Sequence, residues 1–367
     1  MGILQPIWDG TFVYREPVCF SADKDGRPTG GTLLYQPEEI LSVTSFDGSV
    51  FYQPVRDYTA NGRQLVRTEA SRIPYLERSV YCKPFTGVPE TAWVRLSGGK
   101  AYMEVVSDVY RWQTLVTYTH RDKWAGFQPE ACGESLPRSM EKLRAGGDFH
   151  LTLYGDSITA GWEASGCNER AIDMVTLGEY HVSLWHAPYQ PAWAELVTNA
   201  LQARYPQSNV IKTNRAAGGS TVQWGVEHAA ELVPPCKPDL IMLGFGMNSM
   251  QESAEDYRRA ILSIIRTIRK ECHDCEFVLM SPMIPNPEIK GFQNNQLPAQ
   301  QDVLYQIAAE LEGVCIAPVH SVFREMTACG KHYLELTGNC INHPNDFSVR
   351  VYAQTVLRTL GVDGNDG

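Results

Sequence analysis

Between residues 10 and about 127, apolar and polar side chains alternate at a period of two in runs such as 40–46, 50–55 and 64–67, the pattern of half-buried β-strands. Asp-Gly at 47–48 and Asn-Gly at 61–62 separate such runs, which is the strongest short-range signal for a β-hairpin. No helical period of useful length occurs here, so the pattern predicts an all-β domain over 1–127, a sandwich of the jelly-roll type. One face of the run at 109–120 carries Tyr110, Trp112, Thr114, Val116 and Tyr118.

From residue 148 onward, short apolar runs alternate with helical patterns, which indicates a parallel sheet. Ser253 precedes Asp256 by three residues, as in the capping box that begins a helix. Together these patterns predict a flavodoxin-like, three-layer α/β domain over 148–367, preceded by a Pro- and Gly-rich linker at 128–147 with a short helix at 138–144. Strands are expected at 149–154, 209–213, 240–243, 277–281 and 314–317, and helices at 191–204, 254–270, 299–312 and 347–360.

Bulk properties narrow the classes of function. The chain has 367 residues, enough for two domains, and carries 32 basic against 42 acidic residues, which argues against a nucleic-acid or anionic-membrane partner. No apolar run is long enough to span a membrane, and the start of the given sequence has no signal-peptide pattern, so a cytoplasmic location is expected. A homo-oligomer stays open.

Ten cysteines are scattered without a repeating spacing and are expected to be reduced and mostly buried. Cys272 and Cys275 form a single Cys-x-x-Cys pair between a helix and a strand, which favours a turn over a metal site. We therefore expect neither a metal nor a cofactor.

The candidate chemistry starts at Ser157, in the Gly-Asp-Ser turn directly after the strand expected at 149–154. Open α/β sheets bind ligands at the carboxyl ends of their strands. A serine in such a turn is ordinarily only a turn former, and as a nucleophile it needs a base within hydrogen-bond reach. His343 is the candidate base because Pro344 keeps it out of the helical conformation, at the edge of the sheet before the last helix.

Two further motifs follow expected strands: residues 214–221 read Asn-Arg-Ala-Ala-Gly-Gly-Ser-Thr, and 246–248 read Gly-Met-Asn. With the Gly-Asp-Ser turn and Asn-His-Pro-Asn-Asp at 342–346, they resemble in order and spacing the SGNH, or GDSL-like, hydrolases over about residues 148–361. The resemblance implies Ser157 as nucleophile and His343 as general base and then acid. It also implies an oxyanion hole made by the backbone N–H groups of Ser157 and Gly219 and the side-chain amide of Asn248.

The acid of the triad departs from this family, which commonly has Asp three residues before its His, where this chain has Cys340. We expect a Ser–His dyad in which the main chain near Asn339 or Cys340 orients the imidazole. Asp346 is the nearest carboxylate, and we interpret it as the N-cap of the last helix. Asp156 is expected to hold the serine turn through hydrogen bonds to backbone N–H groups.

Residues 162–190 connect the serine turn to the next helix with little periodicity, and such long connections are usually functional. This segment must pass over the site, and with the irregular stretch 282–298 it is expected to wall the pocket. The pocket candidates are Trp162, Tyr189, Gln190 and, beyond the Gly219 turn, Trp224.

The resemblance extends to two-domain deacetylases that join a β-sandwich to a hydrolase domain, many of which act on acetylated xylan. It implies a metal-independent serine esterase that removes short acyl groups, mainly acetyl, from small-molecule or oligosaccharide esters such as acetylated xylo-oligosaccharides. An acyltransferase or thioesterase would use the same residues. A non-catalytic carbohydrate-binding protein is the third alternative, because Cys340 and Ser249 stand where the family usually has Asp. The sequence does not assign a ligand to the N-terminal domain.

Overall fold

A five-stranded parallel sheet forms the centre of the C-terminal part of the chain. The computed structural model describes residues 3–84, 86–87, 101–103 and 109–362. If the five strands are numbered as they follow in the chain, their order across the sheet is 2-1-3-4-5, which is the flavodoxin-like order. This confirms the predicted α/β fold. Across the sheet the strands are β13 (Ser208–Asn214), β10 (Gly147–Gly155), β14 (Leu240–Gly244), β15 (Glu276–Met280) and β16 (Val314–Ala317).

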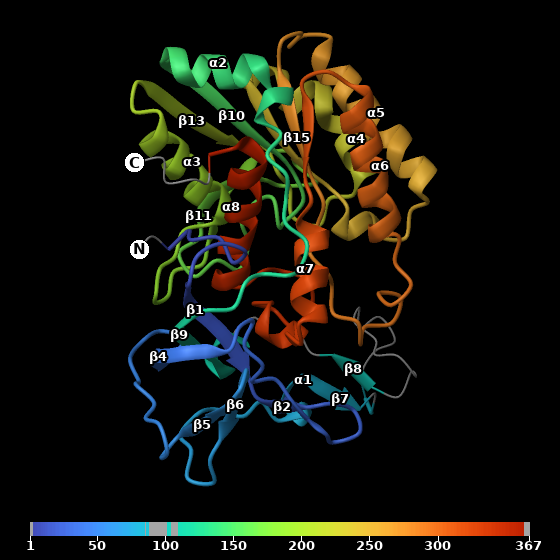
Figure 1. Ribbon diagram of the computed structural model, residues 1–367. Helices are drawn as coiled ribbons and strands as arrows, with labels where there is room; N and C mark the ends of the chain where they lie inside the picture. Colours follow the sequence, from blue (N-terminus) through green and yellow to red (C-terminus); the bar gives the residue numbers. More distant parts are fainter. Residues whose placement is uncertain (1–2, 85, 88–100, 104–108, 363–367) are drawn as a thin grey trace.

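Helices cover both faces of this sheet (Figure 1). On one face lie α3 (Trp193–Arg204) and α8 (Asp346–Leu360), and on the other α4 (Val222–Leu232), α5 (Ala254–Arg269) and α6 (Leu297–Glu310). Alternate strand residues serve the two layers: Leu151 and Leu153 belong to the apolar cluster of α3 and α8, and Ile241 and Leu243 to that of α4 to α6. Because both faces are buried, the strands read as continuous apolar runs.

The N-terminal part is rich in strands, as predicted. A three-stranded antiparallel sheet has the order β1 (Phe12–Cys19), β9 (Gln113–His120), β4 (Pro37–Ser45). The Asn-Gly signal at 61–62 joins β5 (Tyr58–Asn61) to β6 (Gln64–Arg67) in the expected hairpin. The jelly-roll arrangement itself stays a prediction. Shorter ribbons pair β2 (Ser21–Ala22) with β3 (Pro28–Thr29) and β7 (Cys82–Pro84) with β8 (Ala101–Met103).

The strand predicted over 109–120 is wrong in its first residues. Tyr110 and Trp112 lie in a short 3₁₀ helix, η1 (Val109–Trp112), and only residues from Gln113 onward form β9. A period of two over four residues does not distinguish an extended chain from such a turn, and the tertiary surroundings decide.

The strand-rich region and the α/β part share one interface (Figure 1). A single apolar cluster contains Val18 and Leu33 of the first region and Val349 of α8. Arg350 of α8 donates to the carbonyl of Tyr14 in β1 at 2.8 Å. The N-terminal region therefore packs directly on the helix that follows His343. The division into domains at 1–127, 128–147 and 148–367 stays a prediction, and the proposed linker holds α2 (Pro137–Ala145).

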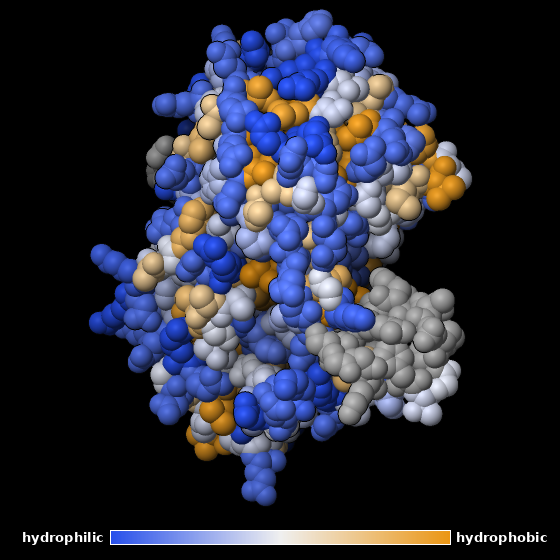
Figure 2. All heavy atoms as spheres, turned by 90° about the vertical axis from the view of Figure 1, so that its right-hand side faces the viewer, coloured by the Kyte–Doolittle hydropathy of each residue, from blue (hydrophilic) through white to orange (hydrophobic). Residues whose placement is uncertain are grey.

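Hydrophilic side chains predominate on the face of the molecule in Figure 2. Within the described ranges, no helix combines the length and the apolar character needed to cross a bilayer.

Candidate active site

The structure brings Ser157 and His343 together although 186 positions separate them in the sequence. Ser157 follows the carboxyl end of β10, and His343 precedes the first turn of α8. The Ser157 hydroxyl oxygen lies 2.8 Å from Nε2 of His343. Both residues are almost buried, with exposed fractions of 5% and 8%. This geometry allows a proton to pass between the hydroxyl and the imidazole.

Hydrogen bonds from Asp156 hold the serine turn. Its Oδ1 accepts from the backbone N–H groups of Ile158 at 3.0 Å and Thr159 at 3.4 Å. Burial raises the pKa of Asp156 to about 6, while these N–H groups and the nearby His343 act in the opposite direction. The carboxylate is thus occupied within the turn, which fixes the backbone that carries Ser157.

The two other loops at the same sheet edge carry Gly219 and Asn248. Gly219 has a φ of 80°, which only glycine adopts freely, and a Cβ added there would meet no atom within 4 Å. The space beside this residue is therefore open. Asn248 donates one amide hydrogen to the carbonyl of Ser220 at 3.0 Å, and its amide carries a second hydrogen. Their role as oxyanion donors stays a prediction.

Ser249 stands where the resemblance implies Asp, and its hydroxyl still supports the site. It accepts from the backbone N–H of Val222 at 2.9 Å, at the start of α4. This contact ties the Asn248 loop to the loop that carries Gly219. An uncharged hydroxyl therefore stands in place of the family's carboxylate and holds the two loops together.

Two of the groups expected to orient His343 do something else. Asn339 accepts through Oδ1 from the backbone N–H groups of Ile341, Asn342 and His343 at 2.9–3.1 Å, so it folds the loop rather than contacting the ring. Cys340 lies in a buried apolar cluster, and its carbonyl accepts from Asn286 at 2.8 Å. The expected orientation by the main chain is wrong, because among the described residues no carbonyl accepts a hydrogen bond from Nδ1 of His343.

Asp346 also differs from its expected role. The N-cap of α8 is Asn345, whose side chain accepts from the backbone N–H of Ser348 at 3.0 Å, and Asp346 is already helical. Both oxygens of Asp346 accept from Ser165, one from its N–H at 2.8 Å and one from its hydroxyl at 2.7 Å. Burial raises the pKa of Asp346, although Ser165 acts in the opposite direction. Asp346 therefore anchors the 162–190 segment to α8.

In the described ranges, the carboxylate that contacts the remaining imidazole nitrogen belongs to Glu163, to which the sequence assigned no role. Its Oε1 lies 3.5 Å from Nδ1 of His343. Among the residues that the structure describes, Nδ1 has no hydrogen-bond partner. The only sequence signal was its position, six residues beyond Ser157 in the segment expected to pass over the site.

Of the four residues predicted to line the pocket, Trp162 lies beside the catalytic histidine. Its ring meets that of His343 edge-on, with centroids 5.6 Å apart. A Cβ added at Gly218 would lie 2.6 Å from the indole, so the glycine lets this ring pack closely. Tyr189 is 49% exposed and pairs with the exposed Trp185, with ring centroids 5.2 Å apart.

The side chains of Gln190 and Trp224 are buried in the protein interior. The prediction that they line the substrate pocket is therefore wrong. Gln190 is buried and donates through Nε2 to the carbonyl of Asp346 at 2.7 Å. Trp224 belongs to the apolar cluster of α4 to α6, and its Nε1 donates to the carbonyl of Met174 at 3.1 Å. Both side chains have polar groups already bound within the protein.

The 162–190 segment is more regular than expected. It contains an antiparallel hairpin of β11 (Asn168–Ile172) and β12 (Glu179–Ser183). The backbone N–H of Ile172 donates to the carbonyl of Ala216 at 2.9 Å, beside the loop of Gly219. The hairpin therefore rests against the loop that carries Gly219.

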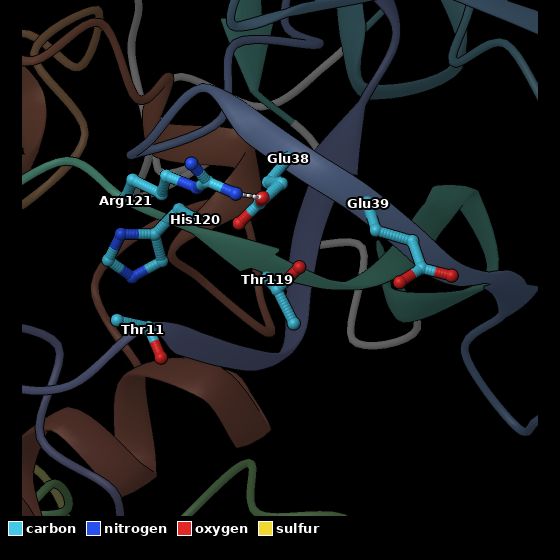
Figure 3. Close-up of a pocket in the computed structure, with 6 residues that line it drawn as sticks. All are labelled: Thr11, Glu38, Glu39, Thr119, His120 and Arg121. Atoms are coloured by element: carbon cyan, nitrogen blue, oxygen red, sulfur yellow. Dashed lines mark hydrogen bonds and ion pairs between the residues drawn. The ribbon is translucent and has the colours of Figure 1, made fainter.

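Two other features lie apart from these residues. The segment around Cys272 and Cys275 forms the expected turn, in which the N–H of Cys275 donates to the carbonyl of Cys272 at 3.3 Å. Over the described part of the chain, no three His, Cys, Asp or Glu side chains gather in a group that would hold a metal. A hollow on the N-terminal sheet is lined by Thr11, Glu38, Glu39, Thr119, His120 and Arg121, and two of its charged groups, Arg121 and Glu38, pair with each other (Figure 3).

Comparisons with known proteins bear on the region that contains this site. Residues 153–347 match the model of the GDSL-like lipase/acylhydrolase family. Similar solved structures include a two-domain esterase active on acetylated mannans, with 20% identity and a TM-score of 0.48 over 64% of this chain and 55% of that one. Another is the acetylxylan esterase Axe2 from Geobacillus stearothermophilus, with 20% identity and a TM-score of 0.46 over 59% of this chain and 96% of that one. The chain thus spans little more than half the length of the mannan esterase. No curated protein matches the chain.

Proposed function

Because the chain belongs to the GDSL-like lipase/acylhydrolase family, we propose that it is a serine esterase that hydrolyses short acyl esters, acetyl above all, of carbohydrates. The observation that carries this proposal is the distance of 2.8 Å between the Ser157 hydroxyl and Nε2 of His343. A neutral hydroxyl becomes a useful nucleophile only when a base is this close. The expected substrate is a small-molecule or oligosaccharide acyl ester.

In the first half-reaction, the Ser157 oxygen attacks the ester carbonyl carbon while Nε2 of His343 takes the hydroxyl proton. The resulting oxyanion accepts hydrogen bonds from the backbone N–H groups of Ser157 and Gly219 and from the free amide hydrogen of Asn248. The bond between the carbonyl carbon and the alcohol oxygen then breaks, and His343 gives its proton to the leaving alcohol. The product is an acyl-enzyme on Ser157.

In the second half-reaction, water attacks the acyl-enzyme and passes one proton to His343. Collapse of this intermediate breaks the bond to Ser157, and His343 returns the proton to the serine oxygen. The acid leaves, and the enzyme regains its initial state. Removing one donor of an oxyanion hole typically costs about 10²–10³ in kcat, so the amide donors carry much of the rate.

The limited exposure of Ser157 supports a short acyl group. Ser157 is only 5% exposed, and the indole of Trp162 stands beside the imidazole and is held against Gly218. We expect a fixed ring beside the catalytic imidazole to favour a short acyl chain. The exposed pair of Trp185 and Tyr189 supports a carbohydrate as the alcohol part, because flat aromatic faces pack on the apolar face of a sugar ring.

The test compares p-nitrophenyl acetate with the butyrate and octanoate esters and measures acetate release from acetylated xylo-oligosaccharides. We expect the highest kcat/KM on acetate, loss of turnover in Ser157→Ala, and labelling of Ser157 by a fluorophosphonate. A higher kcat/KM on octanoate contradicts the short-acyl preference. A folded protein that does not react with the fluorophosphonate contradicts the esterase itself.

A further inference from the structure

The imidazole of His343 needs a second partner if it is to act as a base. In a serine triad, an acceptor at Nδ1 keeps the proton on that nitrogen, so that Nε2 faces the serine with its lone pair, and it stabilises the imidazolium that forms. In the described part of this chain, Nδ1 is buried and makes no hydrogen bond. A buried polar atom without a partner costs about 1–3 kcal/mol, so this arrangement calls for an explanation.

Two other carboxylates near His343 are already bound to other groups. Asp346 gives both oxygens to Ser165. Asp156 accepts from the N–H groups of Ile158 and Thr159 and so belongs to the turn of the nucleophile. Among the described residues, neither of these carboxylates forms an ion-pair contact with His343, whereas Glu163 does.

Glu163 meets the requirements of distance and burial. Its Oε1 is 3.5 Å from Nδ1, and the two side chains are only 11% and 10% exposed. This distance exceeds that of a formed hydrogen bond, but such contacts are often long in a free enzyme and shorten as charge develops on the ring. A charge-assisted bond then forms between the imidazolium and the carboxylate.

The backbone at Glu163 is held in an unfavourable conformation. Its φ of 70° lies in the left-handed region, which costs a residue other than glycine about 1–3 kcal/mol and persists only where the surroundings enforce it. Such residues cluster at active sites. Here the conformation lets a residue of the serine loop (156–163, after β10) direct its side chain back toward the histidine loop (329–345, before α8).

Gly338 provides the room that this side chain occupies. A Cβ added at Gly338 would lie 2.9 Å from Cβ of Glu163 and 3.5 Å from its Oε2. The N–H of Gly338 donates to the carbonyl of His343 at 3.0 Å. Glu163 therefore packs on the same short stretch of backbone that fixes His343, and the two loops form one unit.

We propose that Glu163 is the carboxylate that orients His343, through Oε1 and Nδ1, in a triad whose acid comes from the serine loop. The inference rests on the proposed esterase function. No proton passes to Glu163, because the proton of Ser157 moves to Nε2 and on to the leaving alcohol. Glu163 is a positioning residue, because it acts on the substrate only through His343.

The first test replaces Glu163 by Gln, which keeps the shape of the side chain and removes its charge. We expect kcat on p-nitrophenyl acetate to fall by about 10²–10⁴, with KM within about threefold of the wild type, as for the loss of a triad acid elsewhere. The matched control is Glu179→Gln in the same segment, whose carboxylate pairs with Arg170 and Arg215 and whose loss should leave kcat unchanged.

The second test uses proton NMR of the phosphonate adduct on Ser157, in which His343 is protonated. The wild type and Glu179→Gln should show a low-field resonance from the Nδ1 proton, and Glu163→Gln and His343→Ala should lack it. A purely structural role of Glu163 would not remove this signal from a folded adduct. The proposal is overturned if Glu163→Gln retains the resonance or more than about a third of the wild-type kcat. Wild-type turnover and labelling would in that case leave the esterase function standing, whereas an inert wild type would overturn both.

Discussion

Replacement of Lys331 by Met is expected to destabilise the whole protein, because this lysine is buried between the N-terminal region and the histidine loop. Its ammonium nitrogen lies 2.9 Å from Glu16 of β1 and 3.3 Å from Glu335, and none of the three side chains is exposed. It also donates to the carbonyls of Pro17 at 2.6 Å and Thr32 at 3.0 Å. Burial alone would lower the pKa of Lys331, but the attraction of the two carboxylates outweighs it and the pKa is raised.

The magnitude follows from what the substitution leaves behind. Without the ammonium group, two carboxylates remain in a dry interface, and removing one partner of a buried ion pair costs about 3–5 kcal/mol. Other donors limit the loss: Glu16 also accepts from the N–H of Leu34 and the hydroxyl of Tyr118, and Glu335 from the N–H of Gly31. We therefore expect the free energy of unfolding to fall by about 3–5 kcal/mol.

Urea unfolding followed by tryptophan fluorescence measures this difference. The matched control is Lys142→Met, because Lys142 also pairs with a carboxylate, that of Asp239 at 2.6 Å, but its side chain is 41% exposed. The control should lose less than about 1 kcal/mol, as for other exposed pairs. If Lys331→Met loses no more than Lys142→Met, the buried cluster does not stabilise the interface and the reasoning is refuted.

Three further substitutions test the site. Burial raises the pKa of Asp156 from 3.8 to about 6, so its proton stabilises the folded state below about pH 4 and this contribution is lost as the pH rises through 6. The wild type should therefore lose about 3 kcal/mol of unfolding free energy between about pH 4 and pH 7 that Asp156→Asn does not lose. Urea unfolding at several pH values measures this, and an equal pH dependence of stability in the two proteins would argue against it. Asp346→Ala leaves the Ser165 donors unpaired and should lose about 2–4 kcal/mol of stability in urea with kcat within about threefold of the wild type; a loss of kcat as large as that of His343→Ala would make Asp346 the acid. Gly219→Ala has room for its methyl group, but alanine disfavours a φ of 80°, so the N–H should move and kcat on p-nitrophenyl acetate should fall by about tenfold or more at similar KM; an unchanged kcat would contradict the dependence of turnover on this backbone conformation.

The sheet could be predicted because its strands have a strong local signal. Each parallel strand is buried on both faces and therefore appears as a short apolar run between polar loops. Helix α5 was predicted with its cap, since the Ser253 hydroxyl accepts from Asp256 N–H as the capping pattern implies. Helices α4 and α7 (Val319–Ala328) were missed. In α4, Gly225 weakens the helical signal, yet an added Cβ there would lie 2.6 Å from the ring of Phe245, so packing of the helix on the sheet explains the glycine.

The site could be predicted only where its residues sit in local motifs. Ser157 and His343 each belong to a short pattern at a strand end or a helix start, and the fold then determines their distance. Glu163 belongs to no such pattern, because its contact with His343 depends on the path of the 162–190 segment, on a left-handed backbone and on the absence of a side chain at Gly338. None of these properties is local to Glu163 in the sequence.

The position of Cys340 gives a physical reason for an acid that comes from the serine loop. Cys340 is fully buried in an apolar cluster with Cys19 and Tyr81 of the N-terminal region, so the stretch before His343 serves as an anchor for that region. A carboxylate in place of this thiol would be buried among apolar groups, at a cost of several kcal/mol. The serine loop already lies against the histidine loop at Gly338. Glu163 of the serine loop therefore places a carboxylate beside Nδ1 of His343 without disturbing the interface with the N-terminal region. The packing of the N-terminal region and the origin of the acid are therefore parts of the same structural arrangement.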